Sequence, residues 1–178
     1  MSKRTKFVFQ GLQVFSWIIF IGLSIEAGAL LVNFVYSLFK PEAVHNLYQK
    51  LDLSQIYGLN KWAYYGIYSF VMTISFLKAY LFYVVIELLS KLDLEKPFTG
   101  TVSGKITRIS YITLSIGLVS YIARQTAKGL MHYGFDTSPL DKFWADSNSF
   151  ILMAAVLYVI ASIFKRGIDL QNENDLTV

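Results

Sequence analysis

Four long apolar segments constrain this chain more than any other feature of its sequence. They cover about residues 11–38, 62–89, 109–131 and 149–164, and most of the charged residues lie between them. A membrane-spanning helix needs about 20 mostly apolar residues, whereas the helices of soluble proteins space their apolar residues three or four apart. The sequence therefore predicts an all-α, polytopic membrane protein, a four-transmembrane-helix bundle that forms a single domain over residues 1–178.

Composition agrees with a membrane protein and argues against a cofactor or an enzyme. The chain is 54% hydrophobic and only 16% charged, where soluble domains carry about a quarter charged residues. Cysteine is absent, which excludes disulfides and thiolate chemistry, and both histidines, His45 and His132, fall between the apolar segments. No serine, histidine and carboxylate set is spaced for nucleophilic catalysis. We therefore expect no catalytic residues, no cofactor and no metal.

The distribution of Lys and Arg predicts the orientation. These residues accumulate on the cytoplasmic side of short connections. Nine of the sixteen lie in the N-terminal segment, the loop at 90–108 and the tail at 165–178. Four lie in the loops at 39–61 and 132–148. The net charge of +4 therefore reflects topology and anionic lipid, and we expect membrane lipids as partners and no direct binding of nucleic acid. Both termini are predicted to be cytoplasmic.

An alternative for the first segment is a cleaved secretory signal. Basic residues precede it, and Ala27-Gly28-Ala29 imitates a cleavage site. The apolar run resumes at once and continues to Leu38, which a mature secreted segment would not need. An uncleaved first helix is the simpler interpretation.

The two outer loops contain further signals. Apolar residues of 41–51 recur at helical spacing after Pro41, which predicts a short helix that caps the bundle or, less favoured, acts as a lid over a ligand. The second outer loop carries Asp136, Asp141 and Asp146 at a spacing that matches no calcium loop, and Trp144 is interpreted as an interfacial anchor.

The inner loop and the tail are the most patterned cytoplasmic segments. Pro97 is expected to stop the second helix, and Thr99 to cap a new turn that leads into the third. Gly167 is expected to end the last helix, before a tail in which acidic and apolar residues alternate. We expect this tail to fold back onto the basic inner loop, with contact to a soluble partner as the alternative.

Ionisable and polar side chains within the apolar segments form a predicted intramembrane polar cluster. Charges at mid-bilayer usually pair, reach the interface or line a polar cavity. Helical rise places Glu26 at a depth between Lys78 and Arg124. Helical spacing predicts inward faces with Tyr64 and Tyr68 on the second segment, and with Tyr121, Arg124 and Lys128 on the third. The cluster comprises Glu26, Asn33, Lys78, Arg124 and Lys128.

Two interpretations of this cluster stay open. It is either a structural ion pair that fixes the helix arrangement, or a binding site. The surplus of positive charge favours an anionic or lipid-like ligand in the second case, and the corresponding function is a small transporter or channel.

Two stretches resemble a known family. They are Phe76-Leu-Lys78-Ala-Tyr80, running on through Glu87 to Lys96-Pro97-Phe98-Thr99, and the chain end from Phe164 to Val178. Together with four spans, they resemble the bacterial membrane proteins of the domain-of-unknown-function 2975 family.

The resemblance implies a multi-pass protein of the bacterial cytoplasmic (inner) membrane and no established activity. Its implied partner is a small helix-turn-helix transcription factor, which such a membrane protein would hold or silence. We therefore predict a non-enzymatic membrane regulator or anchor with a cytoplasmic interaction surface. That surface comprises Lys96, Pro97, Phe98, Thr99, Gly167, Leu170, Glu173, Asp175, Leu176 and Thr177.

Overall fold

The computed structural model describes residues 3–93 and 98–175. These residues form helices and no strand, which confirms the all-α prediction. The four long helices are α1 (Lys3–Phe39), α3 (Lys61–Lys91), α4 (Gly100–His132) and α6 (Ser147–Asp175). The short elements are η1 (Pro41–His45), η2 (Tyr48–Lys50), α2 (Ser54–Leu59), η3 (Ser138–Leu140) and α5 (Asp141–Trp144). Each predicted apolar segment lies within one long helix, and all four are long and apolar enough to cross a membrane.

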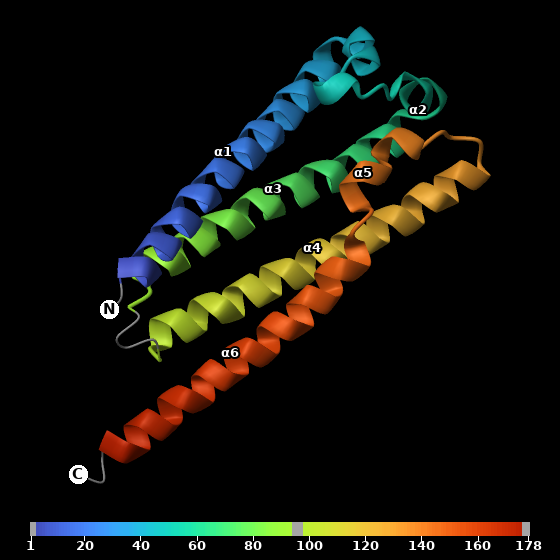
Figure 1. The fold of residues 1–178 in the computed structure, drawn as a ribbon. Coiled ribbons are helices and arrows are strands. Elements are labelled where there is room, and N and C mark those ends of the chain that lie inside the picture. Colours follow the sequence, from blue (N-terminus) through green and yellow to red (C-terminus); the bar gives the residue numbers. More distant parts are fainter. Residues whose placement is uncertain (1–2, 94–97, 176–178) are drawn as a thin grey trace.

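The long helices pack in chain order (Figure 1). Helix α1 lies against α3, α3 against α4, and α4 against α6, with successive helices antiparallel. Helix α6 therefore lies at the opposite side of the bundle from α1. Both chain ends lie at one end of the bundle, called the termini end below, and the short helices lie at the other, called the loop end.

Asparagine and threonine caps start two of the long helices. The Asn60 side-chain oxygen accepts hydrogen bonds from the backbone N–H groups of Trp62 and Ala63, at 2.9 and 3.3 Å. The Thr99 hydroxyl accepts one from the Val102 N–H at 3.3 Å. Such caps satisfy backbone donors that a helix start leaves without partners. The predicted role of Thr99 is therefore confirmed.

A buried aromatic cluster holds α1 to α3 in the half of the bundle nearer the loop end. Tyr64 and Tyr68 are both 0% exposed, which confirms the predicted inward face of α3. The Tyr64 hydroxyl donates to the Ser37 hydroxyl and the Tyr68 hydroxyl to the Leu30 carbonyl, both at 2.9 Å. Buried hydroxyls of this kind join helices where no water competes for the bond.

Small residues bring α4 and α6 together. An added Cβ on Gly117 would lie 2.9 Å from the backbone nitrogen of Ile151, and the Ser110 hydroxyl donates to the Ala154 carbonyl at 2.9 Å. The predicted inward face of the third segment was therefore wrong in part: Tyr121 is 46% exposed and Lys128 is exposed. The buried face of α4 instead combines aliphatic side chains with small ones. The aliphatic residues are Val102, Ile106, Ile109, Ile112 and Ile116, and the small ones are Ser103, Ser110, Thr113, Gly117, Ser120, Ala123 and Ala127.

The loop at 40–53 covers the loop end, although not as the single helix that we predicted. It forms the two 3₁₀ turns η1 and η2, and Lys50 adopts a positive φ of 57° before Leu51. Val44, Leu47 and Leu51 are nevertheless buried, so the apolar spacing identified the side chains that pack inward. A capping role is consistent with this burial.

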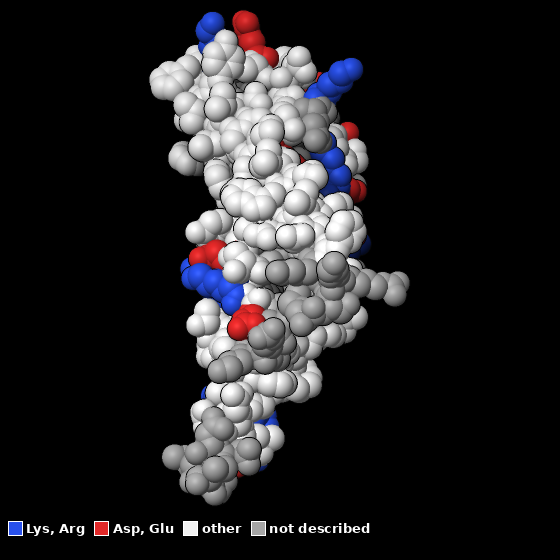
Figure 2. All heavy atoms as spheres, turned by 60° about the vertical axis from the view of Figure 1, so that its left-hand side comes forward, with Lys and Arg blue, Asp and Glu red and all other residues white. Residues whose placement is uncertain are grey.

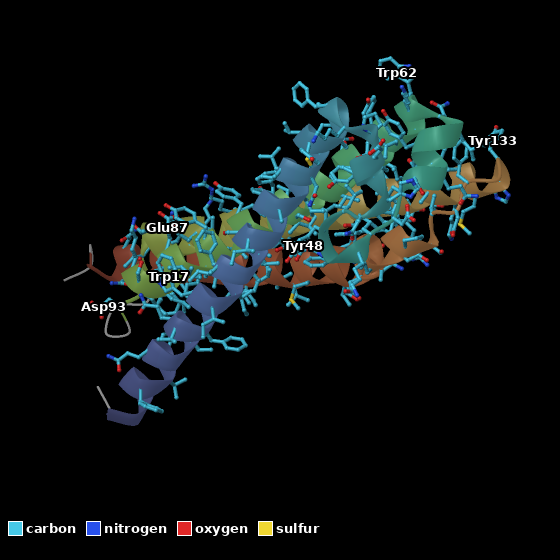
Figure 3. All side chains as sticks on the ribbon, turned by 90° about the horizontal axis from the view of Figure 1, so that it is seen from above. Trp17, Tyr48, Trp62, Glu87, Asp93 and Tyr133 are labelled. Atoms are coloured by element: carbon cyan, nitrogen blue, oxygen red, sulfur yellow. The ribbon has the colours of Figure 1, made fainter. Side chains whose placement is uncertain are left out.

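The outer surface matches a membrane environment. Apolar side chains on α1 and α6 are widely exposed, for example Phe15 at 62% and Leu152 at 69%. On the face drawn in Figure 2, most of the visible surface is uncharged, and the charged side chains appear in small groups along its length. Figure 3 shows Trp62 and Tyr133 at the loop end, and Trp17, Glu87 and Asp93 toward the termini end. Aromatic residues at both levels are typical of membrane interfaces.

Candidate functional site

At the termini end, the two stretches that suggested the family meet. The rings of Phe98 and Phe164 lie 5.3 Å apart between centroids. An added Cβ on Gly167 would lie 2.7 Å from the Phe98 ring, so the glycine leaves the space that this ring fills. Phe98, directly before α4, is thus packed on the last turns of α6.

The end of α6 corrects the predicted tail. The helix does not end at Gly167 but continues to Asp175, and the tail therefore does not fold back over this range. Leu170 is 51% exposed and Glu173 is also exposed. Glycine is tolerated here because its missing side chain makes room for Phe98, at a helix-propensity cost of about 1 kcal/mol. Lys96, Pro97, Leu176 and Thr177 lie outside the described residues, and so does the Asp175 side chain.

Two polar contacts between α3 and α4 lie near the same end and were missed from the sequence. The Lys105 ammonium pairs with the Glu87 carboxylate, and the Arg108 guanidinium donates to the Tyr80 hydroxyl. Glu87 and Tyr80 both belong to the stretch that suggested the family, which was the only signal for these contacts. Arg108 also lies over the Tyr80 ring, 5.2 Å from its centroid.

The predicted intramembrane polar cluster is divided between separate places. Glu26 is half-buried and forms no ion pair with Lys78 or Arg124, so the structural ion pair that we considered is not formed. The Lys78 ammonium instead lies 5.8 Å from the ring centroid of Phe150 on α6, a cation–π contact. The Asn33 amide donates to the Ala29 carbonyl of its own helix at 2.9 Å.

Arg124 and Lys128, in contrast, share one cavity at the loop end. The cavity has a volume of about 410 Å³ and lies between α4 and the segment that holds η3 and α5. Among the described residues, neither cation forms an ion pair or a hydrogen bond. The cavity is lined by Arg124, Ala127, Lys128, Met131, Thr137, Asp141, Trp144 and Ala145.

Hydrogen bonds and burial fix the far wall of this cavity. The Thr137 hydroxyl donates to the Ala127 carbonyl at 3.3 Å, and Thr137 is 0% exposed. Trp144 is 1% exposed and its indole N–H donates to the Asp141 carboxylate at 3.3 Å. The predicted role of Trp144 as an interfacial anchor was therefore wrong, because its ring packs into the core with Leu140 and Phe143.

The neighbouring Asp136 is engaged locally and does not line the cavity. Its carboxylate accepts hydrogen bonds from the hydroxyl and the backbone N–H of Ser138, at 2.6 and 3.0 Å. These bonds hold the pKa of Asp136 below its ordinary value, since they stabilise the charged form. Asp141 is thus the carboxylate that faces the two cations.

Comparison with known proteins gives one finding. A family model described as "Protein of unknown function (DUF2975)" matches residues 40–178, which is most of the chain. No curated protein and no solved structure matches. The match covers the helices α3, α4 and α6 and both segments that meet at Phe98 and Gly167. The chain belongs to the DUF2975 family of proteins of unknown function.

Proposed function

We propose that this integral membrane protein is a non-enzymatic anchor that presents the end of α6 to a soluble cytoplasmic protein. The partner implied by the family resemblance is a small helix-turn-helix transcription factor. In this proposal both chain ends face the cytoplasm, as the excess of Lys and Arg around them favours.

The observation that carries the proposal is the exposed continuation of α6. Beyond Gly167 the helix runs on to Asp175, and residues 169–173 are exposed. Leu170 is apolar and 51% exposed on a segment that otherwise carries acidic and amide side chains. Helices that dock in a partner's groove do so through exposed apolar anchor residues, and Leu170 is available for that role.

The contact between Phe98 and Gly167 supports the same role. It joins the segment before α4 to α6, and so it gives the projecting part of α6 a fixed base. A preorganised helix loses less conformational entropy when it binds than a flexible tail does. Contact with a partner, the alternative in the sequence analysis, is therefore favoured over the folded-back tail that the sequence predicted.

A crosslinking pull-down from native membranes tests this function. Truncation after Ile168 removes the projecting segment but keeps Gly167 and its contact with Phe98. We expect a small DNA-binding protein to be recovered with the full chain and lost with the truncation and with Leu170→Ala. Leu59→Ala, a leucine 61% exposed at the loop end, is the matched control. Equal recovery of the DNA-binding protein with the full chain and the truncation would contradict the proposal.

Transport of an anionic or lipid-like ligand is the second candidate, and the cavity with Arg124 and Lys128 favours it. Glu26 and Lys78 do not line that cavity. This function predicts that flux of an anionic solute into proteoliposomes falls for Arg124→Ala and is unchanged by truncation after Ile168. Flux that is the same for Arg124→Ala and the natural chain would exclude it.

A further inference from the structure

We propose that the cavity at the loop end binds a phosphate group, carried by a phospholipid headgroup or free in solution. The site consists of Arg124 and Lys128 on α4, with Asp141 and Trp144 of α5 also in the cavity wall. The inference does not depend on the docking of a soluble protein, which concerns the other end of the molecule.

The first step of the argument is charge. Arg124 and Lys128 are one helical turn apart, line the same cavity and have no ion-pair partner among the described residues. Asp141, the carboxylate in the cavity wall, accepts from the Trp144 indole. The cavity therefore holds two cations against one carboxylate. An arginine beside a lysine can bind the oxygens of a phosphate group, because guanidinium and ammonium groups both donate charge-assisted hydrogen bonds.

The second step is depth. Residues 109–123 of α4 carry no charge and extend about 22 Å along the helix axis, between Arg108 and Arg124. The hydrocarbon core of a bilayer is about 30 Å thick. Arg124 therefore lies just inside the hydrocarbon edge, at a depth from which a long cationic side chain can reach the interface. Lipid phosphate groups lie at that level.

The third step is the shape of the cavity. Its volume is about 410 Å³, and Ala127, Met131 and Ala145 supply apolar wall beside the charged side chains. A ligand with a charged group and an attached apolar chain could contact both kinds of side chain in this lining. The wall is rigid, because Thr137 and Trp144 are buried and hydrogen-bonded. The site is therefore preformed, which lowers the entropic cost of binding.

Native mass spectrometry of the full-length protein in a neutral detergent tests the proposal with three probes. They are dioleoyl-phosphatidylglycerol, dioleoylglycerol as the same lipid anchor without phosphate, and inorganic phosphate. We expect retention of phosphatidylglycerol and not of dioleoylglycerol. Retention of inorganic phosphate but not of phosphatidylglycerol would assign the same site to free phosphate.

Three variants make the test specific. Arg124→Gln with Lys128→Gln should weaken binding of the retained probe by about tenfold for each cation removed. Lys40→Gln with Lys61→Gln makes the same charge change at the loop end outside the cavity and should leave binding unchanged. Asp141→Asn should strengthen binding, because it removes the opposing carboxylate and keeps an acceptor for Trp144.

Several outcomes would overturn the inference. They are no retention of either phosphate probe, equal binding by the natural chain and the cavity double variant, and equal loss in the control double variant. Weaker binding by Asp141→Asn would also overturn it. If the cavity double variant fails to elute as a monodisperse species, the increase expected for Asp141→Asn decides the question alone.

Discussion

Gly117→Ala should loosen the contact between α4 and α6. The new Cβ would lie 2.7 Å from the Ile151 side chain, 2.9 Å from its backbone nitrogen and 3.2 Å from the Ser147 carbonyl oxygen. A side-chain atom can rotate away, but the two backbone atoms move only if the helices separate. Ordinary contacts begin at about 3.4 Å, so α6 must shift by about 0.5 Å at this point.

The expected magnitude follows from two opposing effects. Overpacking a well-packed contact costs about 1–3 kcal/mol. Replacing glycine by alanine in a helix contributes up to about 1 kcal/mol of stability. Gly129 on the same helix has no atom within 4 Å of an added Cβ, so Gly129→Ala receives only the second effect. The difference in unfolding free energy between the two variants is therefore about 1–3 kcal/mol.

Thermal unfolding in detergent, followed by size-exclusion chromatography of heated samples, measures this difference. For a chain of this length, 1 kcal/mol shifts Tm by about 2–4 °C, so Gly117→Ala should melt about 2–12 °C below Gly129→Ala. Both variants should be compared with the natural chain in the same detergent. Equal Tm values for the two alanine variants would refute the close approach of α6 to Gly117.

Three further predictions concern orientation, a buried hydroxyl and a loop carboxylate. Because the chain has no cysteine, Gln55→Cys and Asn172→Cys each provide a single thiol. An impermeant maleimide on intact cells should label only the first, and labelling of the second would reverse the orientation. Tyr68→Phe removes the hydrogen bond to the Leu30 carbonyl and should cost about 0.6 kcal/mol, so an unchanged Tm would show that this bond is not stabilising. The Ser54 hydroxyl and N–H hold the pKa of Asp52 below its ordinary value of 3.8. The stabilisation is therefore present above pH 3.8 and lost as the pH falls through the lowered pKa; an NMR titration that gives a pKa above 3.8 would contradict it.

Much of the fold could be predicted because the membrane allows few solutions. A long apolar segment must satisfy its backbone polar groups internally, and so each of the four segments became a helix. The cap at Thr99 was also predictable, because proline before it and a hydroxyl side chain at the helix start are local signals. Both the apolar segments and the cap depend only on residues that are close together in the sequence, so a single sequence is enough to predict them.

Features that depend on tertiary contact were harder to predict. Gly167 has the local character of a helix end, yet α6 continues because the glycine makes room for Phe98. Residues of α4 were assigned to the inward face by their polarity. Small residue size was the better indicator of the face that packs against α6, as the close packing at Gly117 shows.

The prediction that the polar residues form one cluster was wrong for a related reason. Depth along each helix placed Glu26, Lys78 and Arg124 at overlapping levels, but depth does not say in which direction around the helix a side chain points. Lys78 contacts Phe150 of α6, whereas Arg124 lines the cavity that Trp144 also lines. The cavity itself needs the packing of α5 on α4, for which the sequence contained no signal that we could identify.

The continuous α6 has a mechanical consequence. From Ile151, where α6 touches Gly117, to Asp175 the helix is about 36 Å long, and because it packs on α4 and Phe98 as far as Gly167, α4 and α6 tilt together as one rigid pair. A change of about 5° in the tilt of this pair would move the cytoplasmic tip of α6 by about 3 Å relative to Ile151 in the proposed orientation. Bilayer thickness acts on helix tilt, and the length of α6 would turn such a small change into a displacement that a bound protein can sense.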